Sequence, residues 1–106
     1  MKELNEMEKL ICLLTYEKIP FQVTTSWGNT LQVWYPNKAE SICDAICHEH
    51  SYGHEEGFLE IMGLVNEEEV GDTVEGWLTA TDVFSRIKKD WKERKRHDCY
   101  DNLPYL

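Results

Sequence analysis

The residues best suited to metal chemistry gather in one short stretch of the chain. Two cysteines and three histidines fall within twelve positions: Cys43, Cys47, His48, His50 and His54. Structural zinc sites usually combine two pairs of such ligands, each pair spaced two to four residues apart. The Cys-x3-Cys pair is followed by no second clean pair, so we expect no bound metal and no other cofactor. The alternative is a zinc site with the ligands Cys43, Cys47, His50 and His54.

A cysteine becomes a nucleophile where a neighbouring histidine or cation lowers its pKa. Cys47 is followed directly by His48, and two such neighbours point to opposite faces of a strand. A second pair, His97 and Cys99, lies near the end of the chain. Neither pair has an identifiable third member, and no glycine-rich phosphate-binding loop is present. We therefore expect that the protein is not an enzyme.

Carboxylates are the most concentrated chemical feature of the sequence. Five lie within nine positions and three more lie beside the histidines: Glu67, Glu68, Glu69, Asp72 and Glu75, with Glu49, Glu55 and Glu56. An acidic surface repels nucleic acid and favours basic partners. We predict that these eight residues form a partner-binding surface for a basic protein. The alternative interpretation is that they only keep a small domain soluble.

Charge is divided unevenly along the chain. The net charge is −9, with −12 on residues 1–85 and +3 on residues 86–106. The bases cluster between Arg86 and Arg96, where Asp90 and Glu93 interrupt them. Because non-specific binding to DNA needs a surplus of phosphate contacts, we expect no direct nucleic-acid binding. The preferred interpretation is a solvated helix face that pairs with the acidic connection.

Hydrophobic periodicity predicts the elements that position these residues. Apolar residues at three- and four-residue spacing predict a helix over residues 2–18, which ends before Pro20. Alternation with period two predicts strands over residues 21–25, 30–35 and 58–64. A short apolar run predicts a further strand over residues 41–48, although a short helix fits the same pattern.

The rest of the chain completes an α+β architecture. Residues 65–78 are predicted as an acidic connection, residues 79–96 as a helix capped by Thr79 and Asp82, and residues 97–106 as a mobile tail. The expected fold is one four-stranded antiparallel sheet flanked by an N-terminal and a C-terminal helix, in the order α-β-β-β-β-α. The predicted core is Leu10, Ile11, Leu14, Val23, Leu31, Val33, Ile46, Leu59, Ile61, Phe84 and Ile87.

Length and composition bound the class of protein. A chain of 106 residues fits a single domain over residues 1–106, and an apolar fraction of 42 % is typical of globular proteins. No run approaches the roughly 20 apolar residues of a membrane span. Acids among the first residues exclude a signal peptide. We expect a cytoplasmic protein with reduced cysteines and no membrane contact.

Two segments, SYGHEEGFLEIMGL and GWLTATDVFSRIKKDW, resemble a family of short uncharacterised proteins from prophages and mobile elements of Gram-positive bacteria. The resemblance covers roughly residues 41–91. It implies no functional residue, because that family has no assigned activity. Its phage context implies an inhibitor of a host defence nuclease in the host cytoplasm. Anti-CRISPR proteins, some of which mimic DNA, are the concrete example.

The resulting hypothesis is a small acidic non-enzymatic protein that binds a basic surface of a host protein such as a CRISPR nuclease. Two alternatives remain open at this stage. One is the zinc-binding structural or regulatory domain described above. The other is a structural protein that associates with itself through edge strands, for instance as a homodimer.

Overall fold

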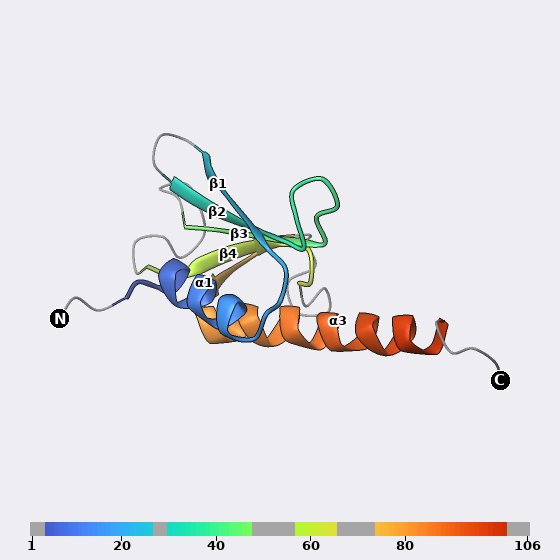
Figure 1. The fold of residues 1–106 in the computed structure, drawn as a ribbon. Helices are drawn as coiled ribbons and strands as arrows, with labels where there is room; N and C mark the ends of the chain where they lie inside the picture. Colours follow the sequence, from blue (N-terminus) through green and yellow to red (C-terminus); the bar gives the residue numbers. More distant parts are fainter. Residues whose placement is uncertain (1–3, 27–29, 48–56, 66–73, 102–106) are drawn as a thin grey trace.

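The computed structural model describes residues 4–26, 30–47, 57–65 and 74–101. Five strands form one sheet in the order β1-β2-β3-β4-β5, and every neighbouring pair is antiparallel. The predicted α+β class, with a helix at each end of the strand series, is confirmed (Figure 1). The elements are α1 (Glu6–Tyr16), β1 (Gln22–Ser26), β2 (Thr30–Tyr35), β3 (Cys43–Ile46), β4 (Leu59–Met62), β5 (Val74–Leu78) and α3 (Ala80–Asp101).

The prediction of four strands is wrong, because β5 lies within the segment that was predicted as an acidic connection. The reason is a β-bulge between β4 and β5, where the register shifts between Leu59 and Ile61. Glu75 pairs with Ile61 and Leu78 pairs with Leu59, so both lie on one face although three positions separate them. An inserted residue of this kind removes the period-two pattern by which a strand is recognised in a sequence.

Of the two structures considered for residues 41–48, the strand is confirmed, since β3 pairs with β2 and with β4. It is shorter than predicted and covers Cys43–Ile46. The backbone turns directly after β4, where Gly63 and Leu64 both have positive φ. A Cβ at Gly63 would overlap the carbonyl oxygen of Ile42, so only glycine fits this close approach.

Both predicted helices are present, with different ends. α1 begins at Glu6 because Asn5 caps it, and it ends at Tyr16, shortly before Lys18 with a φ of 59°. α3 begins at Ala80, directly after Thr79, which forms the predicted capping pair with Asp82, and it continues to Asp101 beyond the predicted end at residue 96. Neither described helix has the length and apolar composition needed to cross a bilayer.

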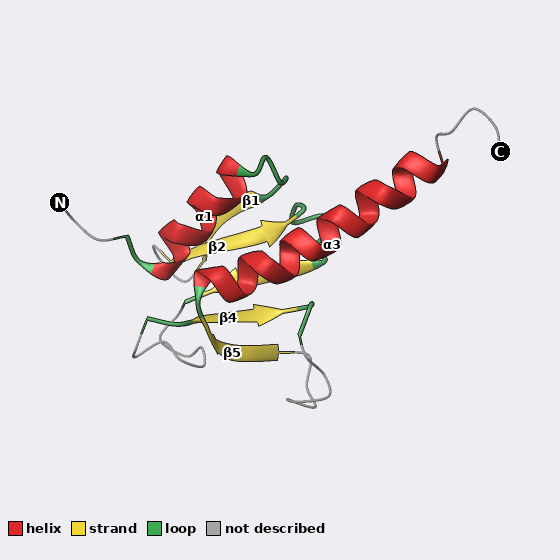
Figure 2. Cartoon of the chain, turned by 90° about the horizontal axis from the view of Figure 1, so that it is seen from below, coloured by secondary structure: helices red, strands yellow, loops and turns green. Residues whose placement is uncertain are grey.

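The two helices lie side by side on one face of the sheet (Figure 2). The sheet side chains that face them alternate along each strand, as period-two geometry requires. Together with the apolar stripes of both helices they form the core: Met7, Leu10, Leu14, Val33, Tyr35, Cys43, Ala45, Leu59, Ile61, Ala80, Val83 and Ile87. We call this face of the sheet the helix face and the opposite one the open face.

Most of the predicted core is confirmed, and three members are not. Ile11 and Phe84 pack against the buried cluster from its margin, while Leu10, Leu14, Val33, Leu59, Ile61 and Ile87 belong to it. Val23 and Leu31 are 39 % and 36 % exposed, because β1 is an edge strand and the helices do not cover its outer side. Ile46 pairs with Gln32 and Glu60 and lies on the open face.

Two neighbours on β4 test this division of faces. Ile61 is 1 % exposed and faces the helices, so Ile61→Ala should lower the free energy of unfolding by about 2–5 kcal/mol through the cavity it leaves. Met62 is 54 % exposed on the open face, and Met62→Ala should cost under about 1 kcal/mol. Urea denaturation of both variants measures the difference. Equal losses would contradict the assignment of faces.

Candidate functional site

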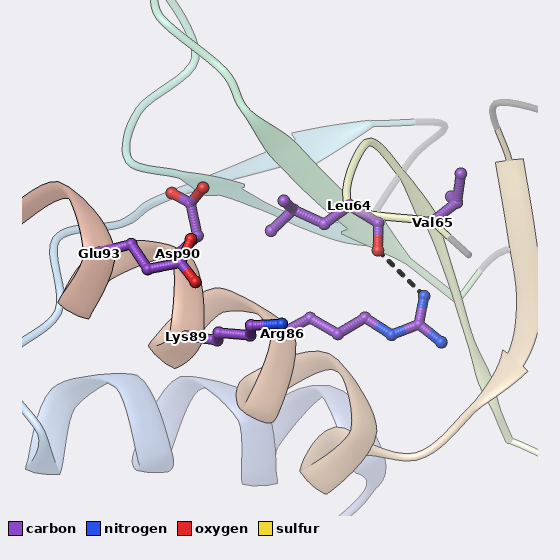
Figure 3. Close-up of a pocket in the computed structure, with 6 residues that line it drawn as sticks. All are labelled: Leu64, Val65, Arg86, Lys89, Asp90 and Glu93. Atoms are coloured by element: carbon purple, nitrogen blue, oxygen red, sulfur yellow. Dashed lines mark hydrogen bonds between the residues drawn. The ribbon is translucent and has the colours of Figure 1, made fainter. Parts of the chain in front are cut away.

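A polar groove lies between α3 and the turn that follows β4 (Figure 3). Its volume is about 370 Å³. Four charged side chains from successive turns of α3 form one wall, and the backbone after β4 forms the other. The lining residues are Leu64, Val65, Arg86, Lys89, Asp90 and Glu93. Charged side chains of α3 therefore converge on this hollow.

The guanidinium of Arg86 ties three segments together. Nη1 and Nη2 donate to the two carboxylate oxygens of Glu75 at 2.7 Å each, and Nη1 also donates to the carbonyl oxygen of Leu64 at 3.0 Å. The hydrogen bond that Arg86 donates to Glu75 is the largest of the effects that raise the pKa of Arg86. This bidentate pair fixes β5 and the turn after β4 against α3.

Asp90 is also bound within the chain. Its Oδ2 accepts a hydrogen bond from the hydroxyl of Tyr35 at 2.7 Å and one from Nε of Arg94 at 2.6 Å. Burial, followed by the hydrogen bond to Asp90, raises the pKa of the Tyr35 hydroxyl well above its usual range. Lys89 and Glu93 remain exposed at the rim of the groove. The groove is therefore held together by internally matched charges and offers no isolated buried charge to a substrate.

Two of the described thiols, Cys43 and Cys47, are poorly placed to act as nucleophiles. Burial raises the pKa of Cys43 to about 12, and burial also raises the pKa of Cys47. A thiol is reactive as its thiolate, so both are poor nucleophiles at neutral pH. Cys47 borders a second cavity of about 360 Å³ at the N-terminus of α1, lined also by Asn5, Glu6, Met7, Thr30, Leu31 and Gly57.

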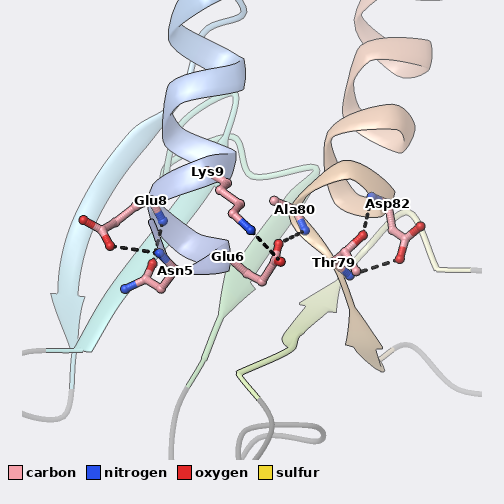
Figure 4. A network of polar contacts seen from close by, with 7 residues as sticks. All are labelled: Asn5, Glu6, Glu8, Lys9, Thr79, Ala80 and Asp82. Atoms are coloured by element: carbon pink, nitrogen blue, oxygen red, sulfur yellow. Dashed lines mark hydrogen bonds and ion pairs between the residues drawn. The ribbon is translucent and has the colours of Figure 1, made fainter. Parts of the chain in front are cut away.

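A second polar network joins the N-termini of the two helices (Figure 4). Glu6 in the first turn of α1 accepts a hydrogen bond from the backbone N–H of Ala80 at 2.7 Å, and Lys9 lies 3.5 Å from its other carboxylate oxygen. A carboxylate between two helix N-termini is favoured by both dipoles. Glu6 thus couples the first helix to the last.

Sequence reasoning missed Glu6, Tyr35 and Asp90 as members of these networks. The contacts join residues 55 and 74 positions apart, from Tyr35 to Asp90 and from Glu6 to Ala80. No local pattern signals such a pair. The acidic first turn of α1 indicates a favourable interaction of Glu6 with the dipole of its own helix. It does not predict a contact with a second helix.

The open face of the sheet is a mixed polar and apolar surface. Gln32 donates to Asp44 at 2.7 Å, and the indole of Trp34 donates to the hydroxyl of Thr24 at 2.7 Å. Lys38 lies 5.8 Å from the centre of the Trp34 ring. Trp34 points away from Val33, onto the open face. Both described helices lie on the other face.

Of the eight residues of the predicted acidic surface, only Glu75 lies in the described part of the chain. Glu75 lies in β5 on the helix face, where Arg86 occupies its carboxylate, and its side chain is 11 % exposed. The other seven predicted residues lie outside the described part of the chain: Glu49, Glu55, Glu56, Glu67, Glu68, Glu69 and Asp72. The segments 48–56 and 66–73 that carry them join β4 at its opposite ends.

Two of the four alternative zinc ligands also lie outside the described part of the chain. Cys43 is buried in the core opposite Tyr35, Cys47 lies just beyond the end of β3, and His50 and His54 lie outside the described residues. No group of three or more potential ligands comes together within residues 4–26, 30–47, 57–65 and 74–101. The expectation that the protein binds no metal stays a prediction.

The predicted pairing of the basic helix with the acidic connection has one observed example, Arg86 with Glu75. Further along α3, Lys88 pairs with Glu17 of the α1 C-cap at 3.0 Å, and Arg94 pairs with Asp90. The C-terminal part of α3 extends past the sheet (Figures 1 and 2).

No protein-family model, curated protein or solved structure matches this chain.

We predict that Arg86 contributes to folding. Arg86→Met leaves the Glu75 carboxylate without its guanidinium in a site that is 11 % exposed, and should cost about 1–3 kcal/mol. Arg94→Met is the control, because Arg94 is 54 % exposed and should cost under about 1 kcal/mol. Urea denaturation compares them. The double variant Arg86→Met, Glu75→Gln should lose less than the sum of its single changes.

Asp44 should give stability a measurable pH dependence. Burial raises its pKa above the ordinary value of 3.8, against the lowering effect of the Gln32 hydrogen bond. The folded state therefore holds the proton to higher pH than the unfolded state, so this contribution to stability is present at low pH and is lost as pH rises through the folded pKa.

Asp44→Asn removes this titration and keeps an oxygen that accepts from Gln32. Its free energy of unfolding, relative to the original chain, should increase between about pH 3 and about pH 7. Glu40→Gln makes the same charge change at an exposed site and serves as the control. A relative stability of Asp44→Asn that does not change with pH, or that changes as it does for Glu40→Gln, would contradict the assigned effect of burial.

Proposed function

We propose that this chain is a small non-enzymatic binding protein that engages a basic, nucleic-acid-binding surface of another protein. The observation that supports this is the location of its charge. Segments 48–56 and 66–73 contain seven carboxylates and no lysine or arginine, so they carry −7 of the net −9. The remainder of the chain carries only −2. We call these two stretches the acidic segments.

The carboxylates of the helices and strands have a different role. Seven carboxylates in or next to these elements accept hydrogen bonds from helix N-termini, from cations or from a buried side chain, and in this way they hold the fold together: Glu6, Glu8, Glu17, Asp44, Glu75, Asp82 and Asp90. Folding therefore accounts for these acids. Seven further carboxylates lie in two short segments that contain no lysine or arginine, and repulsion between like charges costs stability. A basic partner would relieve that repulsion.

The topology suggests how such a partner is engaged. The acidic segments leave β4 at opposite ends, and a strand of four residues spans about 13 Å. Two negative stretches that attach at opposite ends of one strand suit an extended basic surface better than a single cationic pocket. A groove that accepts the phosphates of a nucleic acid has this character, because its cations follow a line of charges.

The resemblance of residues 41–91 to short phage-borne proteins gives the most concrete form of this proposal. In that form the partner is a host nuclease, such as a CRISPR nuclease, and the chain acts in the host cytoplasm as an inhibitor that mimics DNA. The chain itself does not bind nucleic acid in this proposal, because its surplus charge is negative. Of the eight acids predicted to bind the partner, Glu75 is set aside because Arg86 occupies it.

Two matched triple variants test the proposal. Replacing Glu67, Glu68 and Glu69 by glutamine changes one acidic segment, and replacing Glu49, Glu55 and Glu56 by glutamine makes the same charge change in the other. The partner is first captured from host lysate and identified by mass spectrometry. Association rates of the three proteins with that partner are then measured against ionic strength.

At least one triple variant should associate more slowly in dilute buffer, within the roughly 10–10³-fold range of electrostatic steering, and show a weaker salt dependence. Duplex DNA should compete with the original chain for the partner. If one triple variant associates more slowly than the other, the acidic segment that it changes contributes more to binding. Equal association rates of the two variants indicate that both segments steer the partner. Unchanged rates and slopes in both triples, with folding intact by circular dichroism, would refute the proposal.

A further inference from the structure

Among the described strands, β1 lies at the edge of the sheet with its outer side unpaired. β1 has the sequence QVTTS and pairs with β2 through all five residues without a bulge. It is the first strand of the sheet, and none of the described strands pairs with its other side. Natural edge strands usually carry charges, proline or bulges that prevent pairing with another chain. β1 has none of these devices.

The opposite edge of the sheet is protected in the usual way. β5 contains the register shift against β4, and Trp77 has a φ of 62°, which is rare for a large side chain. Trp77 projects there, 58 % exposed, with its ring centre 6.2 Å from that of Phe58. A bulged, twisted edge is a poor template for a further strand. The contrast singles out β1.

Apolar surface accompanies the β1 edge on the helix face. Val23 is 39 % exposed on β1, and Leu31, which pairs with Thr25, is 36 % exposed on β2. Both lie on the face that the helices cover elsewhere. The outer strip of the helix face is therefore partly exposed, and side chains of a strand added beyond β1 would cover part of it.

Charge selects the occupant. The acidic segments join the sheet at β3, β4 and β5, and no charged residue lies in β1. If two copies met at β1, their β3 strands would be about 24 Å apart, from five strand spacings of about 4.8 Å. That exceeds twice the Debye length of about 8–10 Å at physiological salt. Two chains of net charge −9 therefore approach with least repulsion at this edge.

We infer that β1 binds the β1 strand of a second copy of this chain, in an antiparallel pair about a two-fold axis at Thr24. Val23 then faces the partner's Thr25, and Thr25 faces the partner's Val23. A two-fold axis perpendicular to the sheet keeps both helix layers on the same side. The result is a continuous ten-stranded sheet, made of two copies of the observed five. The inference does not depend on the proposed function, because the acidic segments attach elsewhere.

Sedimentation equilibrium of the purified chain, from about 1 µM to about 1 mM, tests the pairing across the range of weak complexes. The original chain should convert from monomer to dimer. Thr25→Lys places a lysine opposite the partner's Val23 and should weaken dimerisation at least about tenfold. Thr81→Lys is the matched control, since it makes the same change at an exposed position of α3, and should dimerise like the original chain.

A charge pair across the interface tests the register. Val23→Glu alone should weaken dimerisation, and Val23→Glu combined with Thr25→Lys should restore it, because each glutamate then faces a lysine of the other copy. As a measurement without substitutions, backbone amides of β1 should exchange hydrogen more slowly as concentration rises. A monomer at every concentration, equal losses in Thr25→Lys and Thr81→Lys, no rescue in the double variant, or β1 exchange independent of concentration would each overturn the inference.

Discussion

This small fold depends on one constraint, the burial of one face of its antiparallel sheet beneath two helices. Leu10, Leu14, Val83 and Ile87 approach from the helices, and Val33, Tyr35 and Ile61 approach from the sheet. A chain of this length has room for one such core. The polar contacts that border the core keep the two helices in place above it. The bond from Ala80 to Glu6 joins their starts, and Asp90 ties α3 to Tyr35.

Arg86 shows how the core margin and the edge of the sheet are linked. Among the described strands β5 neighbours β4 alone, and its pairing is interrupted by a bulge. The bidentate bond from Arg86 to Glu75 compensates for the lost ladder contacts by holding β5 to α3. The same side chain satisfies the carbonyl of Leu64, where the backbone has turned into the left-handed region. A polar groove is the consequence of this packing.

Carboxylates in this chain therefore belong to two populations. Several of those in the described helices and strands accept hydrogen bonds from cations, backbone N–H groups or polar side chains inside the fold. Those in the acidic segments account for most of the net charge. The separation matters for function, because a charge already matched within the fold contributes little to recognition of a partner. It also leaves β1, at the far side of the sheet, as the uncharged edge.

Local patterns in the sequence determined much of this fold. The three- and four-residue spacing of Leu10 and Leu14, the capping pair Thr79 and Asp82, and the alternation around Val33 each depend on near neighbours in the chain. For that reason both helices, four of the strands and the Val33 face of the sheet were predictable. The asymmetry of charge was equally evident, since it requires only counting.

Tertiary structure alone decided the rest. β5 escaped prediction because a bulge shifts its side chains out of alternation, and Glu75 was assigned to a partner surface because nothing near it in sequence announces Arg86. Val23 and Leu31 have the alternation of core residues, yet their exposure depends on how far the helices reach across the sheet. Strand order and helix coverage are set by contacts between distant residues, and a local pattern carries no record of them.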